Sequence, residues 1–171
     1  MNASASQSRY QVRFDFAVRG SAAITHGAHV LVWCDALPTG AAVPPFAGAV
    51  LVGTTGNAAA TAEWILALQS SLADRSIVAV VAAGTDDDGF AVEDFLAAGA
   101  VIDALATIGI DSVSPEAASA CAAYIGLRTA NLHLISASMT GQKISAEARA
   151  AAQEISMMPT VSVLQKFSGA N

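Results

Sequence analysis

The chain contains few basic residues. Its 171 residues include eight lysines and arginines against 14 aspartates and glutamates, for a net charge of −6. Proteins that bind nucleic acid or anionic membranes usually present a basic surface, so we expect neither partner. Cysteine is also scarce. Cys34 and Cys121 lie far apart within apolar segments, which favours free thiols over a disulfide framework.

Long apolar runs are missing, although 54% of the residues are hydrophobic. No run approaches the roughly 20 residues of a membrane helix, so we expect no membrane span. The N-terminus lacks the basic start and apolar core of a signal peptide. We therefore expect a cytoplasmic protein with a disordered N-terminal tail over residues 1–9. Residues 10–171 should form a single α/β domain, because this length suits one hydrophobic core.

Segments typical of strands and helices alternate along the chain. Apolar segments predict strands at Val12–Phe16, Val30–Cys34, Ala49–Val52, Ile77–Ala83 and Thr160–Leu164. Periodicity and capping residues predict helices at Ala58–Ala73, Val92–Ile108, Pro115–Gly126, Leu132–Ser138 and Ala146–Ile155. This alternation predicts a three-layer α/β/α sandwich with a mostly parallel sheet.

Carboxylates occur where such a sheet binds ligands. Asp35 directly follows the strand Val30–Cys34, and Glu93 and Asp94 lie in the first turn of the helix that begins at Val92. Mg²⁺ is usually held by one or two carboxylates, waters and substrate phosphate, so all three residues are candidate metal ligands. Adjacent helical side chains point about 100° apart, so one of Glu93 and Asp94 should bind the ion while the other caps.

Ordinary structural roles are the alternatives for these acids. Asp35 could cap a turn, and acids in a first turn stabilise any helix by roughly 0.3 to 1 kcal/mol. Three further acids, Asp86 to Asp88, form a run that is typical of a solvated loop.

The segment Gly53–Asn57, with the sequence GTTGN, is a candidate phosphate site. It lies between a strand and a helix whose first acid is Glu63, so its backbone amides could bind an anion. The candidate substrate-binding residues are Gly53, Thr54, Thr55, Gly56 and Asn57, together with Lys143 of the turn Thr140–Lys143, which could neutralise charge. Alternatively, Asn57 is an ordinary helix N-cap.

Several segments, in order, resemble the 2-phosphosulfolactate phosphatase (ComB) family. They are QVRFDFAVRGSAAITHGAHVLVWCDAL, VLVGTTGNAAATAEWILAL, AAGTDDDGFAVEDFLAAGAVIDAL, SPEAASACAAY, SMTGQKI and VSVLQKFSGAN. The first resembles the family's N-terminal strand, helix and second strand, and it places Asp35 on the family's aspartate. The resemblance implies a ComB-like fold and a Mg²⁺-dependent hydrolase of a small anionic phosphomonoester. Asp35 and Glu93 would then be the catalytic residues.

Two departures from the family pattern favour a different function. The short link Leu37–Ala47 replaces the long central segment of full-length relatives, and Pro38-Thr39-Gly40 stands where members carry an Arg-Ala-Thr or Ser-Phe-Thr run. The alternative is therefore a catalytically inactive ComB-like binding or assembly module. Alanine-rich helices with little charge, such as Ala117–Ala123, suggest that a second subunit covers an outer face, so we expect a homodimer.

Overall fold

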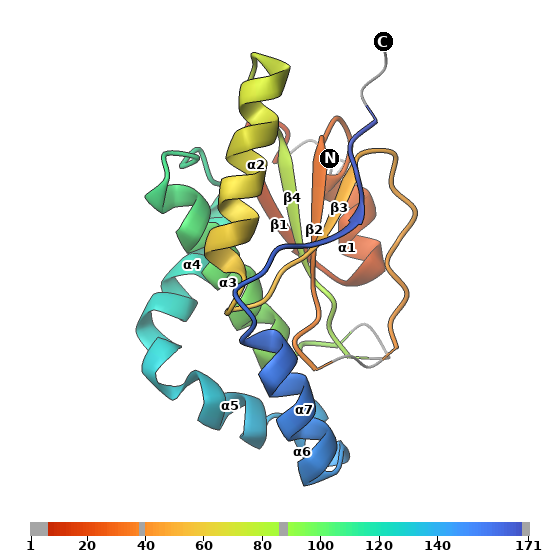
Figure 1. Cartoon of the computed structure of the whole chain (residues 1–171), viewed down its shortest axis with the longest axis vertical. Coiled ribbons are helices and arrows are strands. Elements are labelled where there is room, and N and C mark those ends of the chain that lie inside the picture. The colour runs from red at the N-terminus through yellow and green to blue at the C-terminus, as the bar shows by residue number, and fades with distance from the viewer. Residues whose placement is uncertain (1–6, 38–39, 86–88, 169–171) are drawn as a thin grey trace.

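The computed structural model describes residues 7–37, 40–85 and 89–168. Within these ranges the chain forms a five-stranded sheet of order β1-β4-β2-β3-β5 (Figure 1). The strands are β1 Val12–Phe16, β2 Val30–Cys34, β3 Ala49–Val52, β4 Val78–Ala82 and β5 Ser162–Gln165. Strands β1 to β4 run parallel, and β5 pairs antiparallel with β3 at the edge. The predicted mostly parallel sheet is confirmed.

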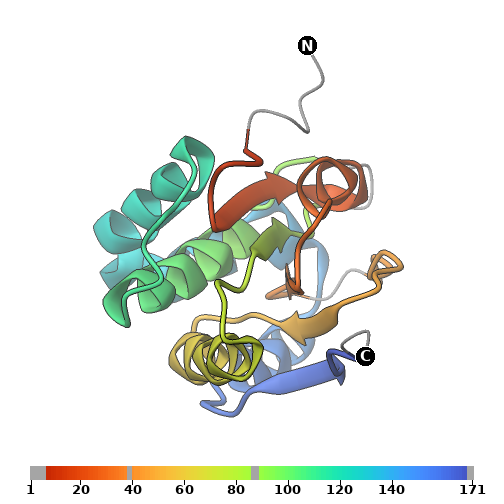
Figure 2. The same cartoon turned by 90° about the horizontal axis from the view of Figure 1, so that it is seen from above.

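Helices cover both faces of this sheet. They are α1 Ala17–Ile24, α2 Ala58–Leu72, α3 Val92–Thr107, α4 Pro115–Leu127, α5 Asn131–Ala137, α6 Met139–Lys143 and α7 Ala146–Ser156, with a 3₁₀ turn η2 Arg128–Ala130. Figure 2 shows α2, α3 and α4 on one face of the sheet and α1 on the other. None of the helices in the described ranges is long and apolar enough to cross a membrane.

The central strands are apolar throughout because both of their faces are covered. Every residue of β2 and β4 is buried. Alternate side chains point to opposite faces, so Val32 and Val80 pack with the α2, α3 and α4 side, whereas Leu31 and Ala79 pack with Ile24 of α1. The result is two cores separated by the sheet, which confirms the α/β/α sandwich.

The second face has a thinner cover than the first. Between β2 and β3 the described residues form a loop and no helix, and residues of this loop, among them Val43 and Phe46, complete the core beside α1. This loop contains the described part of the short link Leu37–Ala47. Apolar side chains of this loop therefore cover part of the sheet beside α1.

The local sequence pattern does not predict α1 or α6. Helix α1 has no side-chain cap and contains Gly20, so its intrinsic propensity is low. An added Cβ at Gly20 would lie 2.7 Å from Cγ of Asp15, so a larger residue would have to displace that side chain. Helix α6 replaces the expected turn Thr140–Lys143, and it begins where the side chain of Ser138 accepts the Gly141 N–H. Tertiary packing and one cap therefore decide both helices.

The last residues of the predicted tail contact the fold. Gln7 donates from Nε2 to the Phe14 carbonyl and accepts the Phe14 N–H at Oε1, both at 3.0 Å. The buried Arg13 guanidinium donates to the carbonyl of Ser8 at 3.0 Å. These bonds attach Gln7 and Ser8 to β1.

Candidate functional site

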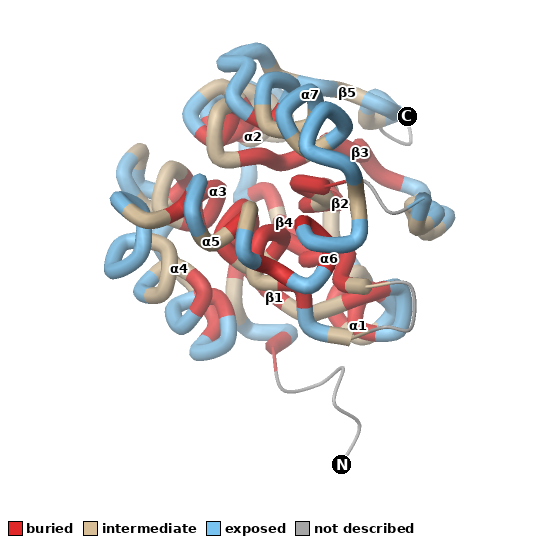
Figure 3. The backbone as a smooth tube through the Cα atoms, turned by 90° about the horizontal axis from the view of Figure 1, so that it is seen from below, coloured by how far each residue is buried: buried red, intermediate tan, exposed pale blue. Residues whose placement is uncertain are grey.

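The carboxyl ends of β2, β3 and β4 meet at one edge of the sheet because these strands are parallel. Helices α5, α6 and α7 lie beyond this edge in Figure 1, and Figure 3 shows them around it from that end. Ala36, directly after β2, packs in the core on the α2 and α3 side, whereas Val43 and Phe46, later in the same loop, pack in the core beside α1. Open α/β sheets usually bind ligands in the crevice at this edge.

Asp94 fixes the two loops that border this crevice. Its Oδ1 accepts the N–H of Ala36, after β2, at 2.8 Å, and its Oδ2 accepts the N–H of Gly84, after β4, at 2.9 Å. The side chain is 2% exposed. Asp94 therefore does not cap its own helix, which begins after Ala91 without a side-chain cap. It ties together the ends of two neighbouring strands.

The charge of Asp94 is unfavourable in this position. Burial raises its pKa well above the usual range of a carboxyl group, and the like charges of Asp35 and Glu93 raise the pKa further. The hydrogen bonds from Ala36 and Gly84 act in the opposite direction. Because the net shift is upward, the loss of hydration outweighs the two hydrogen bonds.

Glu93 lines a cavity of about 270 Å³ between the start of α3 and the α5–α6 region, called here the Glu93 cavity. The Glu93 side chain is 2% exposed, and its Oε2 has no hydrogen-bond partner among the described residues. Thr140, also buried, and Ser138 line the same cavity. A buried carboxylate oxygen without a partner is rare, since such atoms normally bind a proton donor or a cation.

Asp35 lines a second cavity, of about 310 Å³, between the ends of β2 and β3 and helix α7, called here the Asp35 cavity. Thr54, from the loop after β3, and Ser156, the last residue of α7, also line it. Asp35 and Glu93 thus face different cavities, and the charge of Asp94 is coupled to both. Folding brings the three predicted carboxylates to one edge of the sheet.

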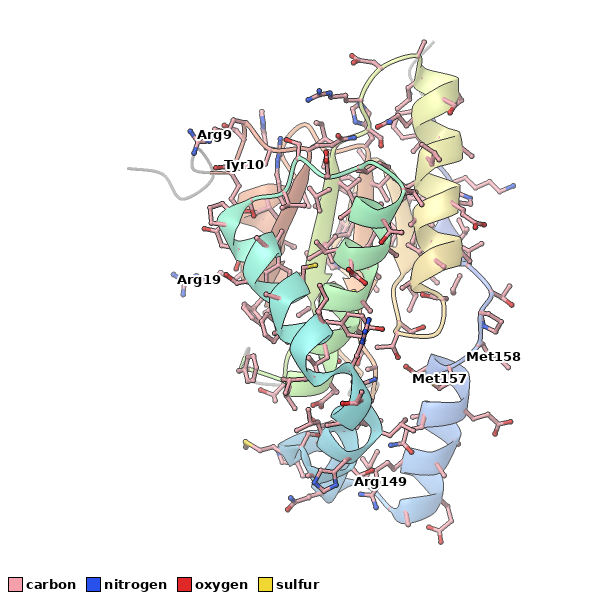
Figure 4. The ribbon with its side chains drawn as sticks, turned by 90° about the vertical axis from the view of Figure 1, so that its left-hand side faces the viewer. Arg9, Tyr10, Arg19, Arg149, Met157 and Met158 are labelled. Carbon is pink, nitrogen blue, oxygen red and sulfur yellow. The ribbon has the colours of Figure 1, made fainter. Side chains whose placement is uncertain are left out.

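The described residues that line the two cavities include no basic side chain. Arg9 and Arg19 lie on the outside of the molecule (Figure 4), and Arg13 bonds to backbone carbonyls beside α1. Arg149 of α7 donates to the carbonyl of Gly141. A phosphate bound here would need another source of positive charge.

Mg²⁺, the cofactor that the resemblance implies, is one such source. Among the described residues, no group of three His, Cys, Asp or Glu side chains is placed to hold a metal ion. Mg²⁺ requires fewer protein ligands, because waters and substrate phosphate complete its shell. The unpartnered Oε2 of Glu93 fits this role, and Asp35 and Asp94 add negative charge that a cation would offset.

Most backbone N–H groups of the loop Gly53–Asn57 already have hydrogen-bond partners within the protein. The N–H groups of Gly53 and Gly56 donate to the carbonyls of Trp33 and Ser156. The Thr54 N–H donates to Oδ1 of Asn57, and the Asn57 N–H donates to Oγ1 of Thr54. The predicted cradle of free amides therefore does not describe this conformation. The Asn57 side chain does not cap α2. Its Nδ2 donates to the Val52 carbonyl and so bonds the loop to the end of β3.

The other candidates lie away from the cavities or outside the described residues. Lys143 is the last residue of α6 and is exposed, and it lines neither cavity. Asp86 to Asp88 and the Pro38-Thr39 pair are outside the described residues.

Sequence reasoning did not single out Thr140 as a contact residue, and it missed Ser156 altogether. Both are buried at the cavities. A small polar residue at a helix end carries no local signal that distinguishes it from a surface residue.

The fold and its carboxylates define an α/β protein with a candidate site at the carboxyl ends of parallel strands. Residues 41–165 match the sequence model of a family described as 2-phosphosulpholactate phosphatase. The match covers most of the 171 residues, and the chain belongs to this family. No curated protein matches the chain.

The match confirms the resemblance inferred from the sequence. It includes the loop Gly53–Asn57, Glu93, Asp94 and Lys143, whereas Asp35 precedes the matched residues. Membership indicates a function like that of 2-phosphosulpholactate phosphatases.

Proposed function

We propose that the chain is a Mg²⁺-dependent hydrolase of a small phosphomonoester. The observation that carries this proposal is the Glu93 carboxylate, which is 2% exposed and has an oxygen without a partner among the described residues. Leaving a buried polar group unsatisfied costs about 1 to 3 kcal/mol, and more for a charged group. A bound cation would recover this cost at a sheet edge where ligands usually bind.

The roles of the residues follow from their contacts. Glu93 would hold the ion, and Asp35 would act on it through its charge from the neighbouring cavity. Asp94 would position both, because it bonds the loop of Asp35 and follows Glu93 in α3. Bound Mg²⁺ would offset phosphate charge and lower the pKa of a coordinated water. The loop Gly53–Asn57 would lie beside the substrate through Thr54, which lines the Asp35 cavity. Lys143 would add charge at the outer edge.

Phosphate release tests the proposal. The substrates are phosphosulfolactate and an aryl phosphate, assayed with Mg²⁺ or with EDTA. We expect EDTA, Glu93→Gln and Asp35→Asn each to lower turnover about 100-fold or more. The exposed carboxylates Glu63 and Asp111 supply the controls, and Glu63→Gln and Asp111→Asn should keep the parent rate. Turnover that is unchanged by EDTA would contradict the role of the metal.

Thermal unfolding gives a second test that does not depend on turnover. Mg²⁺ at 100 times its Kd should stabilise the parent by about 2.7 kcal/mol, which is roughly 5 to 10 °C in Tm for a chain of this size. Glu93→Gln should lose this shift, whereas Glu63→Gln should keep it. An equal shift in both variants would place the ion elsewhere.

The alternative is a catalytically inactive ComB-like binding or assembly module. It is favoured by the absence of described lysine and arginine side chains from both cavities and by the internal use of the loop amides. No phosphate release from folded protein with any metal would support this alternative.

We also propose that the protein forms a homodimer through the outer face of α4. Ile125 and Leu127 at its end are 47% and 40% exposed, and Leu132 nearby in the chain is 54% exposed. Monomers seldom expose large apolar patches. Light scattering at micromolar concentration should give twice the chain mass, and Ile125→Asp should reduce it to that of one chain. A monomeric parent would contradict the proposal.

A further inference from the structure

The Asp35 cavity has mainly apolar walls. Val52 at the end of β3 forms one side, and α7 supplies the other through Ala148, Ala151, Ala152 and Ile155. The volume of about 310 Å³ lies within the usual range of small-molecule sites. An apolar wall stabilises hydrocarbon, because apolar surface is removed from water.

Ser156 adds one buried hydrogen-bonding group to this cavity. It is 4% exposed, and its Oγ has no hydrogen-bond partner among the described residues. A serine in a helix commonly donates to a carbonyl one turn earlier, but no such bond occurs here. The hydroxyl is therefore available to a ligand that carries a donor or an acceptor.

Close packing fixes this wall in place. The Gly56 N–H donates to the Ser156 carbonyl at 3.0 Å. A Cβ on Gly56 would lie 2.3 Å from the carbonyl carbon of Met157, so only glycine permits this approach. The end of α7 is thus held against the loop after β3, and the cavity is part of the folded structure.

Charge limits what the cavity can bind. Asp35 is its one acidic wall residue among those described, and no described basic residue lines it. A second anionic group, such as a sulfonate or carboxylate, would lie beside Asp35 without a cationic partner and would be repelled. An uncharged group has no such penalty.

We propose that the Asp35 cavity binds the apolar body of the substrate, an uncharged alkyl or aryl group with one hydrogen-bonding group directed at Ser156. The phosphate then lies outside the apolar part, toward the carboxylates at the sheet edge. This inference rests on the proposed function and names the substrate class of the same site. It predicts a preference for apolar phosphomonoesters over phosphosulfolactate.

Binding of non-hydrolysable phosphonates tests the inference. Methyl-, ethyl-, propyl- and butylphosphonate are titrated into the parent chain with Mg²⁺ by calorimetry. Affinity should rise about three- to fourfold for each added CH₂ until the cavity is filled. An affinity independent of chain length would overturn the proposal.

Two alanines of α7 provide a matched pair of variants. Ala151 is exposed and lines the cavity, whereas Ala150 is exposed and does not line it. Ala151→Leu should remove most of the gain with chain length, and Ala150→Leu should retain it. Equal behaviour of the two variants would overturn the assignment to this cavity.

Ser156→Ala tests the polar contact. It should lower the affinity for at least one hydroxyphenylphosphonate isomer about 2- to 10-fold and leave phenylphosphonate unchanged. Equal affinities of parent and variant for all isomers would refute the role of Ser156.

Failure of the inference is distinguishable from failure of the proposed function. Benzyl alcohol, titrated without Mg²⁺, probes the cavity independently of the phosphate. Binding of benzyl alcohol that Ala151→Leu weakens, with no phosphate release, would support the apolar cavity and refute the phosphatase. Phosphate release with no preference for apolar esters would support the phosphatase and refute the inference.

Discussion

Replacing Asp94 by asparagine separates two opposing contributions of this carboxylate to stability. The side chain accepts two backbone N–H groups, from Ala36 and Gly84, and it is almost fully buried beside two other acids. Asparagine keeps one acceptor oxygen and places an NH₂ group against the other N–H. It also removes the negative charge, so the hydrogen bonds and the burial of charge change in opposite directions.

The sign of the pH dependence follows from the raised pKa. Below about pH 4 the parent carboxyl is protonated in both the folded and the unfolded chain, and its stabilising contribution is fully present. As pH rises toward the folded pKa, the unfolded chain releases its proton more readily, so the stability contributed by Asp94 is lost. The parent should therefore lose stability relative to Asp94→Asn by up to about 1.4 kcal/mol per pH unit.

At low pH the difference in stability between the parent and Asp94→Asn comes from hydrogen bonding. There the parent should be the more stable chain by about 0.5 to 1.5 kcal/mol, the usual net value of one neutral hydrogen bond. The assay is urea unfolding of both chains from pH 3 to 8, followed by circular dichroism. Asp111→Asn, at an exposed carboxylate, is the control and should differ from the parent by less than about 0.5 kcal/mol.

A parent chain that gains stability relative to Asp94→Asn as pH rises would contradict a raised pKa of Asp94. That outcome would mean that the two N–H groups outweigh burial and lower the pKa. Saturating Mg²⁺ offers a further check, because a cation near the three carboxylates favours their ionised forms. The loss of parent stability with pH should then become smaller.

Two other predictions concern packing and thiol chemistry. Gly99→Ala places a Cβ 2.3 Å from the carbonyl oxygen of Ala120 in α4 and should lower the free energy of unfolding by about 1 to 3 kcal/mol in urea. Gly126→Ala meets nothing within 4 Å and should not destabilise the chain, so equal losses would contradict the packing argument. Burial, Asp94 and Asp35 raise the pKa of Cys34, whereas Cys121 is partly exposed. Iodoacetamide should label Cys121 first and Cys34 only on unfolding, as peptide mass mapping would show, and early labelling of Cys34 would refute this.

The sequence predicts the strands well because their residues are buried on both faces. Strands β1, β2 and β3 have the predicted bounds, and β4 is shorter than Ile77–Ala83 at both ends. β5 lies at the sheet edge and is mostly exposed, so its apolar pattern is weak, and it is displaced toward the C-terminus from Thr160–Leu164.

The residues of the candidate site could be predicted from the sequence, but their separate roles could not. Asp35, Glu93 and Asp94 could be proposed from the sequence, because carboxylates beside strand ends stand out in a chain with little charge. The different contacts of these three carboxylates could not be predicted from the sequence. The structure commits both oxygens of Asp94 to backbone N–H groups 58 and 10 residues away in the chain, and it leaves one oxygen of Glu93 without a described partner.

The amino-acid pattern is enough to specify the class of fold, because strand and helix patterns are local and the order of elements restricts the parallel topology. It also carried the family resemblance, which extends over most of the chain. Tertiary contacts settle that most N–H groups of Gly53–Asn57 have partners and that α7 forms one wall of an apolar cavity beside Asp35. Both depend on contacts between segments about 100 residues apart, such as Gly56 with Ser156, and no local pattern specifies such contacts.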